Sequence, residues 1–171
     1  ESTIIKPEKD KEINNAILLL HGYGGDGKDI SVLTLNWRKH MPNTIFICPN
    51  GHETCEINPI GFQWFDLTKD DTNYILNESL KAEKKLNKFL DEVKEEYSLD
   101  NERIILSGFS QGCMMSINIG LTSQKPFSSI VGFSGKIINK ENLKSRRKTS
   151  TDTLLIHGDM DDIVSPSHLL E

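Results

Sequence analysis

Short, continuous apolar stretches recur along the chain, with longer mixed segments between most of them. Five of these stretches are four or five residues long and are followed closely by Gly, Pro or Asn: residues 16–20 (AILLL), 44–48 (TIFIC), 103–106 (RIIL), 129–133 (SIVGF) and 153–156 (TLLI). Continuous rather than alternating apolarity is typical of strands that are buried on both faces of a parallel sheet. The sequence therefore predicts five such strands, and we also consider an antiparallel edge strand within residues 2–7.

Helical periodicity appears between these strands. Across residues 73–97, apolar side chains recur at steps of three and four and charged side chains mostly fill the other face, which predicts an amphipathic surface helix. Residues 110–122 predict a more buried helix, and residues 30–40 give a weaker helical pattern. Strands that alternate with helices favour βαβ units. We expect a single α/β domain over residues 1–171, a three-layer α/β/α sandwich around a mostly parallel sheet.

Two segments lack clear periodicity. Residues 55–69 form a predicted loop that carries Phe62, Trp64 and Phe65, and long loops rich in aromatic residues often line functional sites. Trp64 is therefore a candidate wall of a substrate site, with packing in the core as the alternative. The basic run at residues 144–148 (KSRRK) is interpreted as a solvated loop.

Composition and charge exclude several classes of protein. The 171 residues carry a net charge of −5, so a basic surface for nucleic acid is not expected. No apolar run approaches the roughly 20 residues that span a membrane. The three cysteines lack zinc spacing and their number is odd, which fits a reduced cytosol better than a disulfide scaffold. With no secretory leader visible at residue 1, these features predict a cytoplasmic protein.

The strongest chemical motif is Gly108-Phe109-Ser110-Gln111-Gly112, which matches G-x-S-x-G between a predicted strand and a predicted helix. A serine hydroxyl needs an exposed position and a base to act as a nucleophile. A tight strand-to-helix turn provides the exposure, and it requires small residues on both sides of the serine. The alternative is an ordinary Gly-Ser turn without chemistry.

Two further motifs follow predicted strands. The first is LLLHGYGGD at residues 18–26, whose glycines let the backbone approach a substrate. Residues 22–28 also match most of a phosphate-binding loop, but Asp29 stands where a Ser or Thr would hold magnesium. The second motif is HGDMDDIV at residues 157–164, where three aspartates compete for the role of a catalytic acid. This segment lacks the Gly and the distal Glu of a calcium loop, so no metal is expected.

Together these motifs resemble the phospholipase/carboxylesterase family of α/β-hydrolases, the group that contains acyl-protein thioesterases. The resemblance covers nearly the whole chain in order, and these segments carry it: LLLHGYGGD (18–26), CPNG (48–51), WFD (64–66), GFSQG (108–112), FSG (133–135) and HGDMDDIV (157–164). It implies an α/β-hydrolase fold and a serine hydrolase that needs no cofactor.

Carried over residue by residue, the resemblance makes Ser110 the nucleophile and Asp161 the acid. The backbone N–H groups of Tyr23 and Gln111 become the oxyanion donors, and Trp64 remains the candidate for substrate binding. The family's catalytic histidine lies beyond its acid, after one more strand. Since His168 follows Asp161 too closely to match, we expect that histidine, the last strand and the last helix outside residues 1–171.

The resemblance implies that a small ester or thioester is the substrate and that the reaction proceeds through an acyl-enzyme. The alternative from another class is a catalytically dead scaffold, or a gene fragment, that binds a ligand or partner. A nucleotide-binding protein, acting through residues 22–28, is the third hypothesis. The sequence predicts neither the acyl chain length nor the oligomeric state.

Overall fold

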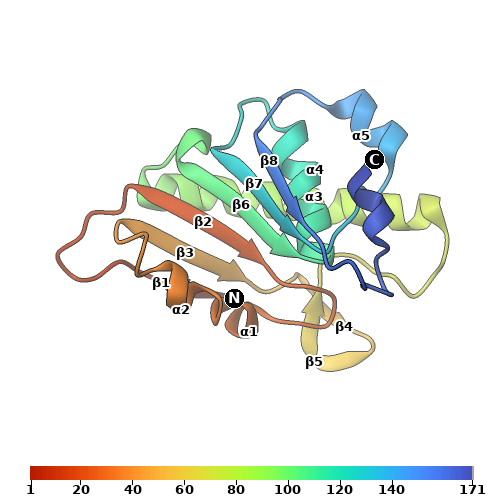
Figure 1. Ribbon diagram of the computed structural model, residues 1–171, viewed down its shortest axis with the longest axis horizontal. Helices are drawn as coiled ribbons and strands as arrows, with labels where there is room; N and C mark the ends of the chain where they lie inside the picture. The colour runs from red at the N-terminus through yellow and green to blue at the C-terminus, as the bar shows by residue number, and fades with distance from the viewer. Residues whose placement is uncertain (171) are drawn as a thin grey trace.

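A computed structural model describes residues 1–170 and contains a six-stranded central sheet in the order β1-β3-β2-β6-β7-β8 (Figure 1). The strands are β1 (Ser2–Ile5), β2 (Asn15–Leu20), β3 (Thr44–Pro49), β6 (Ile104–Phe109), β7 (Ser129–Phe133) and β8 (Thr153–Ile156). All neighbouring pairs are parallel except β1 with β3. The five predicted parallel strands and the antiparallel edge strand are therefore confirmed.

The apolar runs are continuous because both faces of the sheet are covered. In β2, Ala16, Leu18 and Leu20 belong to one buried cluster, whereas Ile17 and Leu19 belong to a second cluster on the opposite face. Successive side chains of a strand point to opposite faces, so a strand with two covered faces needs apolar residues at every position. The pattern AILLL thus places β2 in the middle of the sandwich.

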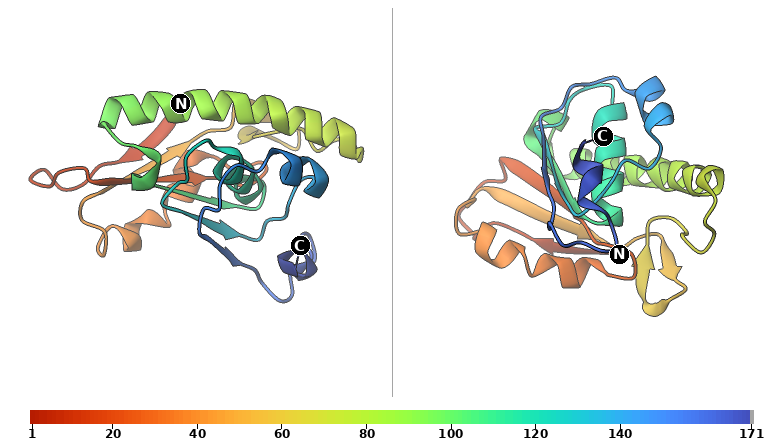
Figure 2. Two further views of the ribbon diagram at one scale, coloured as in Figure 1. Left: turned by 90° about the horizontal axis from the view of Figure 1, so that it is seen from above. Right: turned by 45° about the vertical axis from the view of Figure 1, so that its right-hand side comes forward.

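Helices cover the two faces unequally (Figure 2). On one face lie α3 (Thr72–Tyr97), α4 (Gln111–Thr122) and α5 (Lys140–Arg146), and on the other lie the short α1 (Gly27–Ser31) and α2 (Thr34–Trp37). Asp71 caps α3 by accepting a hydrogen bond from the Tyr74 N–H. Two 3-10 turns, η1 (Asn101–Arg103) and η2 (Pro166–Leu170), complete the elements. This arrangement confirms the predicted α/β/α sandwich.

The predicted loop at residues 55–69 is partly ordered as a two-stranded hairpin, β4 (Glu53–Cys55) and β5 (Asn58–Gln63). Phe62 exchanges two backbone hydrogen bonds with the segment after β2: its N–H donates to the Gly25 carbonyl (2.8 Å), and its carbonyl accepts from Gly24 N–H (2.9 Å). This long-range pairing orders a segment that has no clear pattern of its own. The prediction of a solvated loop at residues 144–148 was partly wrong, because α5 continues to Arg146.

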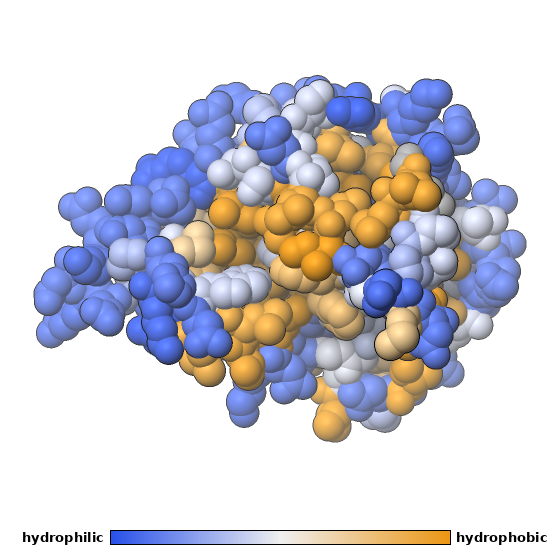
Figure 3. All heavy atoms as spheres, viewed as in Figure 1, coloured by the Kyte–Doolittle hydropathy of each residue, from blue (hydrophilic) through white to orange (hydrophobic). Residues whose placement is uncertain are grey.

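The α1 face of the sheet exposes apolar side chains near β8. The side chains of Phe109, Leu154 and Ile156 are 48%, 56% and 44% exposed, and Figure 3 shows an apolar area over the middle of this face. An apolar cavity of about 570 Å³ opens there, bordered by Leu33, Trp37 and other residues of the α1 and α2 segment. Within residues 1–170, no helix has the length and apolarity to cross a membrane.

Candidate active site

Ser110 occupies a sharp turn between β6 and α4. Its backbone angles are φ 51° and ψ −114°, a region that side chains with a Cβ rarely adopt. Its N–H donates to the Phe133 carbonyl at the end of β7 (2.8 Å), and its own carbonyl accepts from Met114 N–H in α4 (3.1 Å). The predicted strand-serine-helix turn is therefore present, and both flanking elements hold its strained backbone.

The two glycines of the motif allow this turn to close. A Cβ on Gly108 would lie 2.4 Å from the Gly112 carbonyl carbon, and one on Gly112 would lie 2.2 Å from the Leu20 carbonyl oxygen. Neither contact is possible without moving backbone. The glycines thus let α4 start directly against β6 and β2.

The segment after β2 is held by His21, which is 1% exposed. Its Nε2 accepts a hydrogen bond from Gly51 N–H (2.8 Å), and its Nδ1 lies 2.7 Å from the Gly22 carbonyl oxygen. Nδ1 therefore carries the proton that is donated to Gly22. Burial lowers the pKa of His21 below its ordinary value of 6.5, so the ring stays neutral.

The two predicted oxyanion donors lie on the segment after β2 and at the start of α4. Gly24, with φ 76°, turns the chain directly after Tyr23, and Asn58 fixes this turn by donating a side-chain hydrogen bond to the Gly24 carbonyl (2.7 Å). Among the described residues, the backbone N–H groups of Tyr23 and Gln111 donate to no protein acceptor. Both therefore lack a protein partner, and the Gln111 N–H lies in the first turn of α4, where the helix dipole favours negative charge.

The Gln111 side chain is fully buried and was not anticipated as part of the site. Its Oε1 accepts from Trp64 N–H (2.8 Å), and its Nε2 donates to the Phe65 carbonyl (2.6 Å). The Trp64 indole N–H in turn donates to the His21 carbonyl (2.9 Å). Trp64 is only 3% exposed and does not border the 570 Å³ cavity. The structure thus buries Trp64 between Gln111 and His21, where it borders a smaller cavity beside Gly51.

The loop after β8 folds around Asp161. One carboxylate oxygen accepts from Val164 N–H (2.9 Å) and Ile163 N–H (3.1 Å), and the other lies 3.3 Å from His157 Nε2. The hydrogen bond from Val164 is the main cause that holds the pKa of Asp161 below its ordinary value. Of the three aspartates, Asp161 is thus the one whose carboxylate is fixed by hydrogen bonds from its own loop.

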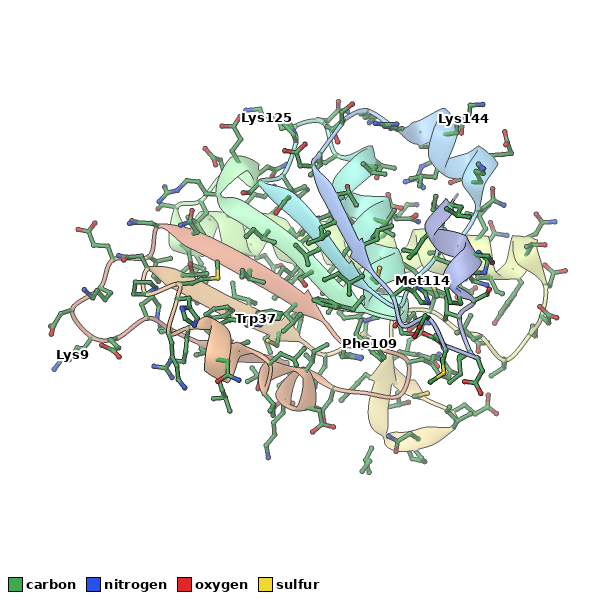
Figure 4. The ribbon with its side chains drawn as sticks, in the orientation of Figure 1. Lys9, Trp37, Phe109, Met114, Lys125 and Lys144 are labelled. Carbon is green, nitrogen blue, oxygen red and sulfur yellow. The ribbon has the colours of Figure 1, made fainter. Side chains whose placement is uncertain are left out.

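The carboxyl ends of the parallel strands bring these segments to one edge of the sheet. Ser134, which follows β7 with φ 49°, donates its N–H to the Ile156 carbonyl at the end of β8 (2.9 Å), just as Ser110 N–H bonds the end of β7. Phe109, which directly precedes Ser110, marks this edge in Figure 4. Tyr23, Phe109 and His157 border the same cavity, so the three predicted motifs meet there.

The rival phosphate-loop interpretation of residues 22–28 meets a different local structure. Gly27 N–H donates to the Asn50 side chain (2.9 Å), and Asp29 N–H donates to the Asp26 carboxylate (2.7 Å). These two N–H groups are therefore already satisfied by protein acceptors. Asp26 acts as the N-cap of the five-residue α1. Its negative carboxylate would repel a phosphate at this helix start.

Comparison with known proteins agrees with this geometry. The profile of the phospholipase/carboxylesterase family matches residues 2–169. The chain belongs to this family. The phospholipase/carboxylesterase assignment confirms the predicted α/β-hydrolase fold and, at the level of the family, the predicted class of ester hydrolase.

Three relatives illustrate the range of similarity. The crystal structure of esterase PE8 is 36% identical with a TM-score of 0.92, covering 99% of this chain and 79% of that one. Acyl-protein thioesterase 1 of Emericella nidulans is 28% identical, covering 90% of this chain and 72% of its own length. Acyl-protein thioesterase 1 of Saccharomyces cerevisiae is also 28% identical, covering 91% of this chain and 74% of its own. Residues 1–171 thus correspond to roughly three quarters of each relative.

Proposed function

We propose that this member of the phospholipase/carboxylesterase family is a serine hydrolase that cleaves small carboxylic esters or thioesters through an acyl-enzyme. The observation that carries the proposal is the turn at Ser110. Its strained backbone presents one hydroxyl at the sheet edge where two unused N–H groups, of Tyr23 and Gln111, are also found. The esterase and thioesterase names of the relatives support this substrate class.

In the proposed reaction, Ser110 Oγ attacks the acyl carbonyl while a histidine outside residues 1–171 takes the hydroxyl proton. The N–H groups of Tyr23 and Gln111 stabilise the negative oxygen of the tetrahedral intermediate. The intermediate collapses, the histidine returns its proton to the alcohol or thiol that leaves, and an ester bond to Ser110 remains. Water, activated by the same histidine, then attacks that ester and releases the carboxylic acid.

Asp161 is suited to orient that histidine because it stays ionised at neutral pH. His21 and His157 are not suited to act as the base. The acceptor nitrogen of His21 already binds Gly51 N–H. His157 Nε2 lies 2.6 Å from the Val164 carbonyl and holds the acid loop together, while its other ring nitrogen, Nδ1, is buried. We therefore assign both rings to structure, and the fold would act as one catalytic domain.

The experiment uses the full-length protein, a fluorophosphonate probe and a short p-nitrophenyl ester. We expect the probe to label Ser110, and Ser110→Ala to abolish both labelling and turnover. Ser145→Ala serves as the control, because Ser145 is exposed on α5 and its hydroxyl only bonds the Asn142 carbonyl.

Two outcomes would contradict the proposal. Undiminished turnover in Ser110→Ala would remove the nucleophile from the mechanism. A folded wild-type protein that neither labels nor turns over would favour the alternative, a catalytically dead hydrolase scaffold that binds a ligand.

A further inference from the structure

A continuous set of hydrogen bonds joins the two segments that carry the proposed oxyanion donors. At the start of α4, Gln111 Oε1 accepts from the backbone N–H of Trp64 (2.8 Å). From the segment after β2, the His21 carbonyl accepts from the Trp64 indole N–H (2.9 Å). Trp64 is thus hydrogen-bonded to both donor segments at once, through its backbone on one side and its side chain on the other.

All residues that form this set of hydrogen bonds are buried. Gln111 is fully buried, Trp64 is 3% exposed, and Phe65 and His21 are each 1% exposed. Breaking any of these hydrogen bonds would leave a polar group without water, so the arrangement is held firmly. The Trp64 and His21 rings also lie against each other, with centroids 5.1 Å apart.

We propose that Trp64 and the side-chain amide of Gln111 are positioning residues that set the separation between the Tyr23 and Gln111 N–H groups. This inference rests on the proposed function. An oxyanion hole requires both donors within hydrogen-bond reach of one oxygen, and an error of about 1 Å costs on the order of a hundredfold in rate. Gln111 thereby acts twice, through its N–H on the substrate and through its side chain on Trp64.

The amide of Gln111 is matched to its two partners. It offers an acceptor to Trp64 N–H and a donor to the Phe65 carbonyl (2.6 Å). Gln111→Glu keeps the shape of the side chain, but its hydrogen bond to the Phe65 carbonyl then forms only when the carboxyl is protonated. A protonated carboxyl both accepts and donates, whereas a carboxylate only accepts and repels the Phe65 carbonyl. Burial raises the pKa of such a carboxyl, so this change falls within an accessible pH range.

The test measures kcat and KM against pH for the full-length protein. We expect the ratio of kcat in Gln111→Glu to kcat in the wild type to rise about tenfold as pH falls through the raised pKa of the new carboxyl. Gln111→Met is the matched control, because it keeps the length but has neither hydrogen bond. Its kcat ratio should be low and independent of pH, and a packing role alone would give Gln111→Glu the same flat ratio.

A milder variant tests the hydrogen bond between the Trp64 indole N–H and the His21 carbonyl. Trp64→Phe keeps an aromatic ring and removes the indole N–H, and we expect kcat to fall about tenfold or more while KM changes little. Ser145→Ala, the exposed control on α5, should leave both parameters unchanged.

The outcomes separate this inference from the proposed function. A Trp64→Phe protein with wild-type kcat would overturn the inference, even if the Gln111 variants failed to fold. A flat ratio for a folded Gln111→Glu protein would also overturn it. A wild-type protein as inactive as Ser110→Ala would instead refute the proposed function, and the inference with it.

Discussion

Gly112→Ala tests whether the close approach of α4 to β2 is what assembles the site. The added Cβ would lie 2.2 Å from the Leu20 carbonyl oxygen and 2.7 Å from the His21 carbonyl oxygen. Both atoms belong to the backbone of the central strand and of the segment that carries Tyr23. No side chain can rotate away to make room, so the first turn of α4 has to move relative to β2.

The size of the effect follows from these contacts. Real Cβ atoms essentially never lie within 3.0 Å of such an atom, so α4 must shift by about 0.8 Å. Strain of this kind in a packed core costs about 1–3 kcal/mol of unfolding free energy. Because the same shift carries the Gln111 N–H away from the Tyr23 N–H, we also expect a loss of up to about a hundredfold in kcat.

Urea unfolding measures the first effect, and ester turnover of the full-length protein measures the second. Gly158→Ala is the matched control for stability, because a Cβ at Gly158 would meet nothing within 4 Å. It should unfold within about 1 kcal/mol of the wild type. If Gly112→Ala proved as stable as Gly158→Ala and fully active, the argument from close approach would be refuted.

Three further predictions concern strain, pH and thiol chemistry. Ser110→Gly should raise the free energy of unfolding by about 1 kcal/mol, because it relieves backbone strain that exceeds the entropic cost of glycine. Urea unfolding measures this gain, and turnover should be lost. Because burial lowers the pKa of His21, the unfolded protein binds a proton at this ring more readily than the folded protein does. The free energy of unfolding should therefore fall as pH drops below 6.5, and it should fall less steeply with pH in His21→Asn. Burial raises the pKa values of Cys48 and Cys113 to about 12, so both thiols should resist iodoacetamide until urea unfolds the protein, as peptide mapping can show.

Much of the fold could be predicted because each strand carries its own signal. The run at residues 16–20 is apolar at every position because side chains from it enter two buried clusters, and α3 repeats its apolar face over 26 residues. The turn at Ser110 could be predicted as readily, because its two glycines stand where any side chain would collide with neighbouring backbone. Local sequence encodes these features directly.

Features that depend on distant partners could not be predicted in the same way. The β4–β5 hairpin relies on Phe62 pairing with the Gly24–Gly25 segment, and the last turn of α5 places Arg146 in an ion pair with Glu83, which lies 63 positions away in α3. The role of the Gln111 side chain depends on Trp64, 47 positions earlier. A glutamine at the start of an apolar helix was the one available signal of a buried polar contact.

The central position of β2 also affects how the chain folds as it is made. Ala16 pairs with Ile45 on one side but with Ile104 on the other, so half of the chain must be synthesised before β2 gains its second neighbour. At about 5–20 residues per second, this wait lasts several seconds. During it, one edge of a strand of five consecutive apolar residues stays unpaired, a state that favours aggregation. Expression at lower temperature or with chaperones should therefore raise the soluble yield by protecting β2 during synthesis.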